Sequence, residues 1–118
     1  KISRGESTQL ALGNLEASRD WGHAKDYVRA MWMMLQHDTP DDFVCSMGES
    51  HTVRQFCDEV FSELNLDYKD FVVVDPVFFR PTELSDLKGD CTKLKKVLGW
   101  EPEYSFKVMI QEMIKKRL

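Results

Sequence analysis

The sequence predicts a small fold of mixed helix and strand, in the α/β or α+β class. Short β-prone runs alternate with segments whose apolar residues recur every three to four positions. The 118 residues are enough for one small domain. Only three runs are strand candidates, however, and three strands cannot make a full doubly wound sheet. Either the chain is a very small α/β unit, or part of its sheet lies outside these residues.

The first half of the chain predicts a strand, a helix and a second strand. The run Leu10 to Gly13 is apolar and ends in a Gly–Asn turn signal. From Ala24 to Leu35 the apolar spacing predicts an amphipathic helix, whose methionines and Trp32 we expect to pack in a core. Phe43 to Met47 reads as a buried strand closed by Gly48.

The second half predicts three helices and one more strand. Thr52 and Gln55 form a capping box, in which each side chain bonds the other residue's backbone N–H, and the helix continues to Leu64. The β-branched residues of Phe71 to Val74 predict a strand.

Two further helices are predicted near the end of the chain. Asp90 is expected to cap a short helix over Thr92 to Leu98, with Gly99 as its C-terminal stop. Ser105 opens the last helix, whose end carries three cations that suit the helix dipole.

The charge and hydropathy patterns exclude several classes of partner. The chain has 16 Lys and Arg against 20 Asp and Glu, a net charge of -4, and a duplex binder usually has a basic face. We therefore expect no nucleic acid partner. No apolar run approaches the roughly 20 residues that a membrane span requires. The first nine residues are polar, which is not typical of a signal peptide.

The cysteines and histidines indicate neither a disulfide framework nor a metal site. They are few and scattered, and they form no Cys-x-x-Cys pair: Cys45, Cys57, Cys91, His23, His37 and His51. Buried, reduced thiols fit a cytoplasmic protein, and we expect no metal.

Two arginines are the candidate binding residues. Arg19 lies in Ser-Arg-Asp-Trp just before the first long helix, and Arg80 lies in Phe-Phe-Arg-Pro-Thr-Glu, about sixty residues later. A guanidinium group is planar, always charged and bonds an anion bidentately, so two of them could converge on a pyrophosphate. Such a pair suggests a nucleotide-sugar site. Alternatively, each arginine pairs only with a nearby carboxylate such as Asp20 or Glu83.

Three neighbouring side chains receive supporting roles in this interpretation. Glu83 could accept a hydrogen bond from a sugar hydroxyl, or it could hold Arg80 in place. Asp26 is expected to orient a neighbouring backbone or arginine rather than to act as a catalytic acid. Trp21 is expected to be a packing anchor rather than a stacking platform.

Several motifs resemble those of the GDP-mannose 4,6-dehydratases, which are extended short-chain dehydrogenases. The most specific is Arg19-Asp-Trp-Gly-His-Ala-Lys-Asp-Tyr-Val28, and the resemblance continues through Pro40-Asp-Asp-Phe-Val44 and His51-Thr-Val-Arg-Gln-Phe56. It resumes at Phe79-Arg-Pro-Thr-Glu83, Gly89-Asp-Cys-Thr-Lys93 and Leu98-Gly-Trp-Glu-Pro102. It therefore covers nearly the whole chain.

The resemblance implies a function and a set of roles. The family converts GDP-mannose to GDP-4-keto-6-deoxymannose with a tightly held NADP, and its members form dimers and tetramers. By position, Arg19 and Arg80 would clamp the diphosphate, Glu83 would contact a ribose or sugar hydroxyl, and Leu10 and Leu12 would flank the base. Residues 1–118 would be the C-terminal nucleotide-sugar-binding portion, with about residues 23–48 packing onto the NADP-binding Rossmann domain.

The chain also departs from the family pattern. It lacks the Gly-x-x-Gly-x-x-Gly turn that cradles the cofactor phosphates, and no tyrosine is followed four positions later by the lysine of a Tyr-x-x-x-Lys pair. We therefore expect a fragment that is inactive alone, with NADP bound by the missing N-terminal region. The alternatives are a related enzyme such as a nucleotide-sugar epimerase, and a non-catalytic nucleotide-sugar-binding module.

Overall fold

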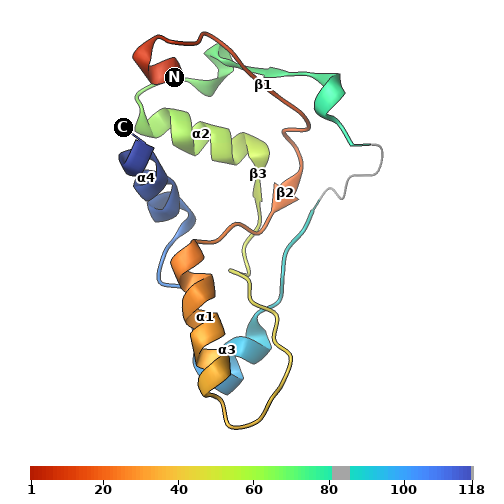
Figure 1. The fold of residues 1–118 in the computed structure, drawn as a ribbon. Helices are drawn as coiled ribbons and strands as arrows, with labels where there is room; N and C mark the ends of the chain where they lie inside the picture. The colour runs from red at the N-terminus through yellow and green to blue at the C-terminus, as the bar shows by residue number, and fades with distance from the viewer. Residues whose placement is uncertain (81–85, 118) are drawn as a thin grey trace.

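The fold separates into two groups of elements, each built around its own hydrophobic cluster (Figure 1). Figure 1 is a computed structural model, and it describes residues 1–80 and 86–117. The molecule is elongated, with principal extents of 53 × 35 × 16 Å. A short 3-10 helix, η1 (Ile2–Arg4), begins the chain. The predicted mixture of helices and strands is confirmed.

The first group contains a small parallel sheet and two helices. Strand β1 (Leu10–Leu12) pairs in parallel with β4 (Val72–Val74), so residues about sixty positions apart become neighbours. Helix α2 (Val53–Glu63) covers this sheet and packs against α4 (Phe106–Arg117). The 3-10 helices η2 (Tyr68–Asp70) and η3 (Pro76–Phe78) lie on either side of β4 in the chain.

The second group consists of two helices and the loop between residues 41 and 50. Helix α1 (Ala24–Gln36) and the short helix α3 (Thr92–Leu98) meet around the fully buried Ala30, Leu94 and Trp100. The indole N–H of Trp100 donates to the Asp26 carbonyl oxygen across 3.0 Å, which fixes the chain after α3 against the first turn of α1.

A two-residue antiparallel pair connects the groups. Strand β2 (Ser18–Arg19) pairs with β3 (His51–Thr52) in the register Ser18 to Thr52 and Arg19 to His51. Ser18 also forms a parallel bridge with Asp86 on its other side. Neither short strand is predicted by the sequence, because two residues carry no hydrophobic period.

The predicted helix ends are confirmed in most details. Thr52 and Gln55 form the reciprocal capping box, and Gly99 adopts the left-handed conformation (φ 71°) that ends α3. The Ser105 hydroxyl accepts a hydrogen bond from the Val108 amide. The cap of α3 differs: the N-cap position belongs to Cys91, although the Asp90 carboxylate still accepts from the Thr92 amide at 2.9 Å.

One prediction is wrong, and another holds only in part. Phe43 to Met47 is not a strand, because no strand within residues 1–80 or 86–117 pairs with it, and a strand exists only through its partner's hydrogen bonds. Its side chains nevertheless pack against the α1–α3 cluster. The expectation for the helix residues holds only in part: Met33 and Met34 pack in that cluster, but Met31 and Trp32 are exposed.

Candidate functional site

The predicted base-flanking residues line an apolar cavity. Leu10 and Leu12 form one wall of a space of about 360 Å³ beside α2. Its other lining residues are all apolar: Trp21, Val53, Phe56, Cys57, Val60 and Phe61. Leu10 remains 39% exposed, so the wall is accessible from outside. A cavity with aliphatic and aromatic walls can hold a flat ring, and it offers no charged side chain to an anion.

Arg19 lies in the β2–β3 pair that joins the two groups. Its side chain is half-buried, and its Nη1 atom donates to the carbonyl oxygen of Ser18 at 2.7 Å. The strand pairing places the Arg19 backbone opposite His51. The guanidinium group is thus carried by backbone that is hydrogen-bonded on the β3 side.

Arg80 lies two residues after the end of η3 and is exposed. The Asp75 carboxylate accepts a hydrogen bond from the Val77 amide at 3.0 Å, and Pro76 supplies the first residue of the turn. These two features set the direction of the chain after β4 and therefore the position of Arg80.

The structure connects the two arginine segments through Ser18. The Leu87 amide donates to the Ser18 carbonyl oxygen at 3.0 Å, next to the Ser18–Asp86 bridge. The connection that begins at Arg80 therefore ends alongside β2, and six residue steps span roughly 20 Å at full extension. Arg80 is thus at the start of this short connection, and Arg19 is next to the residue, Ser18, that its end contacts. Glu83, the third predicted polar contact, lies outside the described residues.

Asp20 is a residue of the site that the sequence interpretation missed. The sequence suggests it only as a partner for Arg19, but its carboxylate accepts three backbone hydrogen bonds: from Met47 (2.9 Å), Gly48 (3.0 Å) and Gly89 (3.2 Å). Neither periodicity nor a motif in the sequence predicts this role, because the three donors belong to segments that are distant in sequence. An aspartate in a turn-rich stretch beside the candidate arginine is the only hint.

Asp26 has the orienting role predicted for it. Its side chain is completely buried and accepts from the amides of Glu103 (2.9 Å) and Tyr104 (3.2 Å) and from Arg29 Nη2 (3.2 Å). Three donors occupy the carboxylate, so it is a structural acceptor rather than a proton donor.

Trp21 packs as predicted. Its ring lies against Phe56 and Phe106, with centroid separations of 5.1 and 6.1 Å. The Phe106 ring also stacks on His51 at 3.9 Å. These contacts attach α4 to the β2–β3 pair and to α2.

Burial keeps three titratable side chains of the described residues in their protonated forms. Burial raises the pKa of the Tyr27 phenol, and burial likewise raises the pKa of the Cys45 and Cys57 thiols, so all three groups favour their protonated forms. The three cysteines are free thiols; Cys57 and Cys91 are buried and Cys45 is half-buried. Within residues 1–80 and 86–117, no group of three or more His, Cys, Asp and Glu could hold a metal ion.

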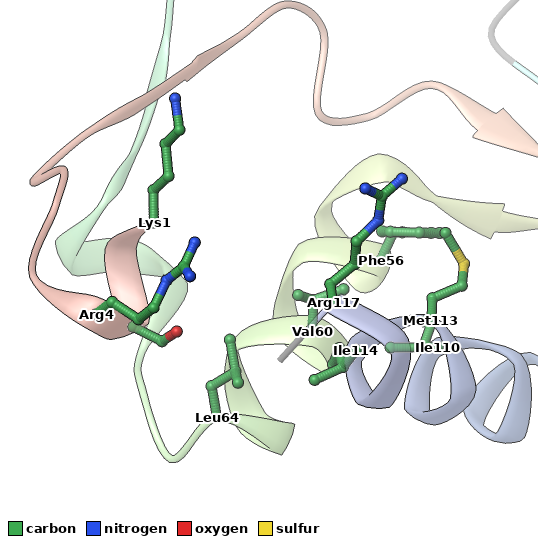
Figure 2. Close-up of a pocket in the computed structure, with 10 residues that line it drawn as sticks. Lys1, Arg4, Phe56, Val60, Leu64, Ile110, Met113, Ile114 and Arg117 are labelled. Carbon is green, nitrogen blue, oxygen red and sulfur yellow. The ribbon is translucent and has the colours of Figure 1, made fainter.

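A second cavity, of about 300 Å³, lies between α2 and α4 (Figure 2). Val60 of α2, Leu64 at the C-cap of α2, and Ile110 and Ile114 of α4 contribute to its apolar lining. Lys1, Arg4 and Arg117 also line it, but none of the predicted site residues does. It is thus separate from the wall formed by Leu10 and Leu12.

Among the described residues, no helix is both long and apolar enough to cross a membrane.

Comparison with known sequences relates the chain to one family of enzymes. A sequence model described as GDP-mannose 4,6 dehydratase matches residues 1–113. GDP-mannose 4,6 dehydratase 1 of Arabidopsis thaliana is 50% identical over 114 residues, which are 97% of this chain and 32% of that protein. The human GDP-mannose 4,6 dehydratase is 44% identical over 131 aligned residues, covering 97% of this chain and 35% of its own length. The chain thus spans about a third of the curated relatives that it matches.

Comparison with solved structures finds proteins that share the fold of this chain. The structure of RMD from Pseudomonas aeruginosa complexed with NADPH has a TM-score of 0.86 at 20% sequence identity, and the match covers 99% of this chain and 39% of that one. At that identity the likeness concerns the fold alone. The chain therefore folds as the corresponding part of an extended short-chain dehydrogenase.

Proposed function

Because this chain belongs to the GDP-mannose 4,6 dehydratase family, we propose that it is the nucleotide-sugar-binding part of such an enzyme. The single observation that carries the proposal is the family match over residues 1–113. The whole protein would act as a lyase that converts GDP-mannose to GDP-4-keto-6-deoxymannose, with NADP as its cofactor. An epimerase acting on another nucleotide sugar is the alternative, and the 50% identity to a dehydratase argues against it.

In this proposal the GDP moiety is bound by residues of β1, of β2 and of the segment that follows η3. Leu10 and Leu12 flank the base, because they form the accessible wall of an apolar cavity. Arg19 and Arg80 clamp the diphosphate, since a guanidinium fork matches two phosphate oxygens in a way that an ammonium group does not. Glu83 contacts a hydroxyl of the ribose or the sugar.

NADP would be bound outside these residues. A dinucleotide site needs a glycine-rich turn that opens a helix, and the four α-helices here begin after His23, Thr52, Cys91 and Ser105 without such a turn. The residues of this chain therefore do not fit the cofactor's phosphates. Their contribution is to bind and orient the nucleotide sugar, and we expect the isolated segment to be inactive.

The segment of about residues 23–48 would pack onto the NADP-binding domain. One face of α1 carries four exposed apolar side chains: Val28 (62%), Met31 (60%), Trp32 (61%) and Leu35 (82%). Val44, in the extended run that lacks a strand partner, is also exposed (56%). A continuous apolar surface of this kind is typical of an interface. We propose that the rest of the same polypeptide covers it and pairs with residues 43–47.

The assembly and location of the protein are also part of the proposal. By its resemblance to the family, the enzyme would be a homo-oligomer, either a dimer or a tetramer. The three free thiols fit the reducing cytoplasm.

The direct test is turnover by the full-length protein that contains this segment. The protein, supplied with NADP, is incubated with GDP-mannose, and the product is analysed by mass spectrometry. Loss of one water from the nucleotide sugar is the expected result. A product of unchanged mass and inverted configuration would instead support the epimerase. If residues 1–118 alone bind GDP but the full-length protein does not turn over GDP-mannose, the chain belongs to a binding module.

A further inference from the structure

The Asp20 carboxylate lies where three separate segments of the chain meet. It accepts hydrogen bonds from the amides of Met47 and Gly48 in one loop and from the amide of Gly89 in another. The donors are 27, 28 and 69 positions away in sequence. No regular element spans this place, so the carboxylate replaces the ladder of hydrogen bonds that a strand pair would supply.

Two of these segments, around Ser46 and Gly89, also approach each other very closely. A Cβ atom added to Gly89 would lie 2.5 Å from the Cβ atom of Ser46. Only glycine allows the two backbones to pack at that separation. We call this meeting point of Asp20, the loop at residues 46–48 and Gly89 the junction. It combines close packing with hydrogen bonds.

The chemistry of the junction requires an ionised carboxylate. Three N–H groups point at two oxygens, and an acceptor-only group satisfies all of them. An asparagine at this position would have one oxygen for three donors, and its own NH₂ group would face an amide N–H. Asp20→Asn therefore loses hydrogen bonds while it preserves the size of the side chain.

The junction connects the backbone of the two proposed phosphate ligands. Arg19 precedes Asp20 directly, and the connection from Arg80 passes Ser18 at residues 86 and 87 before it reaches Gly89. This connection is attached to the Arg19 segment twice: through the backbone of Ser18 and through the side chain of Asp20. Without the second attachment, only the β2 contacts would locate the end of the Arg80 segment.

We propose that Asp20 is the positioning residue of the diphosphate clamp: its carboxylate holds the Arg19 and Arg80 segments in the spacing that a diphosphate requires. This inference rests on the proposed function, in which the two arginines bind the diphosphate of a nucleotide sugar. Asp20 touches no part of the ligand. It acts through the backbone that carries the arginines.

The test measures affinity for GDP and for guanosine in the full-length protein by titration calorimetry. Asp20→Asn is expected to weaken GDP binding at least about tenfold, because a displaced arginine loses bidentate, charge-assisted hydrogen bonds to the diphosphate, each worth about that factor or more. Guanosine lacks the diphosphate, so its affinity is expected to change by less than about twofold. The matched control is Asp67→Asn, which makes the same change at a carboxylate that accepts the Lys69 amide away from the clamp.

A double-mutant cycle separates this inference from the proposed function. Arg19→Ala and Arg80→Ala test the clamp itself, and if neither weakens GDP binding, the proposed diphosphate site is wrong. If both weaken it and Asp20→Asn binds GDP like the unaltered protein, the clamp stands and the role of Asp20 is wrong. The Arg80→Ala loss is expected to shrink in the Asp20→Asn background, because a misplaced arginine contributes less.

The same affinities distinguish a positioning role of Asp20 from a general role in folding. Equal losses of GDP and guanosine affinity in Asp20→Asn would overturn the inference. If that variant does not fold, Asp20→Glu replaces it: the charge and both acceptor oxygens remain, but the added methylene shifts the junction. A selective loss of GDP affinity is again expected, and an unchanged ratio of GDP to guanosine affinity would overturn the inference.

Discussion

His23 joins the start of α1 to α4 by using both of its ring nitrogens. Its Nδ1 atom accepts a hydrogen bond from the Lys25 amide at 3.0 Å as the N-cap of α1, which leaves the proton of the neutral ring on Nε2. Nε2 then donates to the Glu112 carboxylate across 2.9 Å. The side chains of Lys25 and Lys116 also lie near this carboxylate, at 3.7 and 3.3 Å. Glu112 is therefore the acceptor through which α4 is fixed to the first turn of α1.

This contact predicts a stability change with pH. The hydrogen bond from His23, followed by that from Lys116, lowers the pKa of the Glu112 carboxyl below its ordinary value of 4.5. A depressed pKa in the folded state contributes stability that is complete above the ordinary value and is lost as the pH falls through the folded-state value. Glu112→Gln should therefore be less stable than the unaltered protein at pH 7, and the difference should shrink below about pH 4.5.

Urea unfolding of both proteins at pH 7, 5 and 3.5 measures this difference. The exposed Glu101 provides the control, because its carboxylate forms no hydrogen bond or ion pair with the described residues. Glu101→Gln should therefore leave the unfolding midpoint unchanged. A Glu112→Gln difference that stays constant from pH 7 to 3.5 would contradict the assignment.

Asp26 predicts a large loss of stability without any direct effect on the ligand. Asp26→Asn would leave one of the two backbone amides without an acceptor and would remove the fully buried carboxylate that pairs with Arg29. We expect the free energy of unfolding to fall by about 3 kcal/mol, the usual cost of breaking a buried charged network. Chemical denaturation measures this, with the exposed Asp38→Asn as the matched control; equal midpoints for the two variants would show that Asp26 is not the acceptor described.

The clamp predicts that lysine cannot replace arginine at residue 80. Both Arg80→Ala and Arg80→Lys should weaken binding of GDP-mannose, by about 100-fold and about tenfold, because both lose the bidentate fork and only one loses the charge. Titration of the full-length protein measures both. Arg117→Ala, at an exposed arginine outside the proposed site, is the control. Normal binding by Arg80→Lys would rule out bidentate recognition at this position.

The uncovered face of α1 predicts a position-specific effect on the full-length protein. If the rest of the polypeptide covers this face, Val28→Ser should lower the free energy of unfolding by about 2 kcal/mol through lost apolar burial. Val108→Ser makes the same change on α4, at a valine that is 43% exposed, and should cost less than about 0.5 kcal/mol. Thermal unfolding compares the two variants, and equal losses would count against an interface on α1.

Local chemistry accounts for the elements that the sequence predicts well. The apolar spacing from Ala24 to Leu35, the Thr52–Gln55 box and the Gly99 stop act over one or two helical turns, so they are readable in the sequence. The strands at Leu10 and Val72 follow from apolar and β-branched runs. Arg19 and Arg80 can likewise be selected as candidates from the sequence, because the guanidinium group and the adjoining turn are both local features.

The sequence by itself determined the helices, the two longer strands, the orienting role of Asp26 and the family. Only the tertiary structure decided that β1 pairs with β4, that Phe43 to Met47 finds no partner strand, and that Asp20 serves the amides of Met47, Gly48 and Gly89. The physical reason is the same in each case. A strand pairing or a carboxylate shared by distant amides is a property of two or more segments, and neither segment carries a signal for the other.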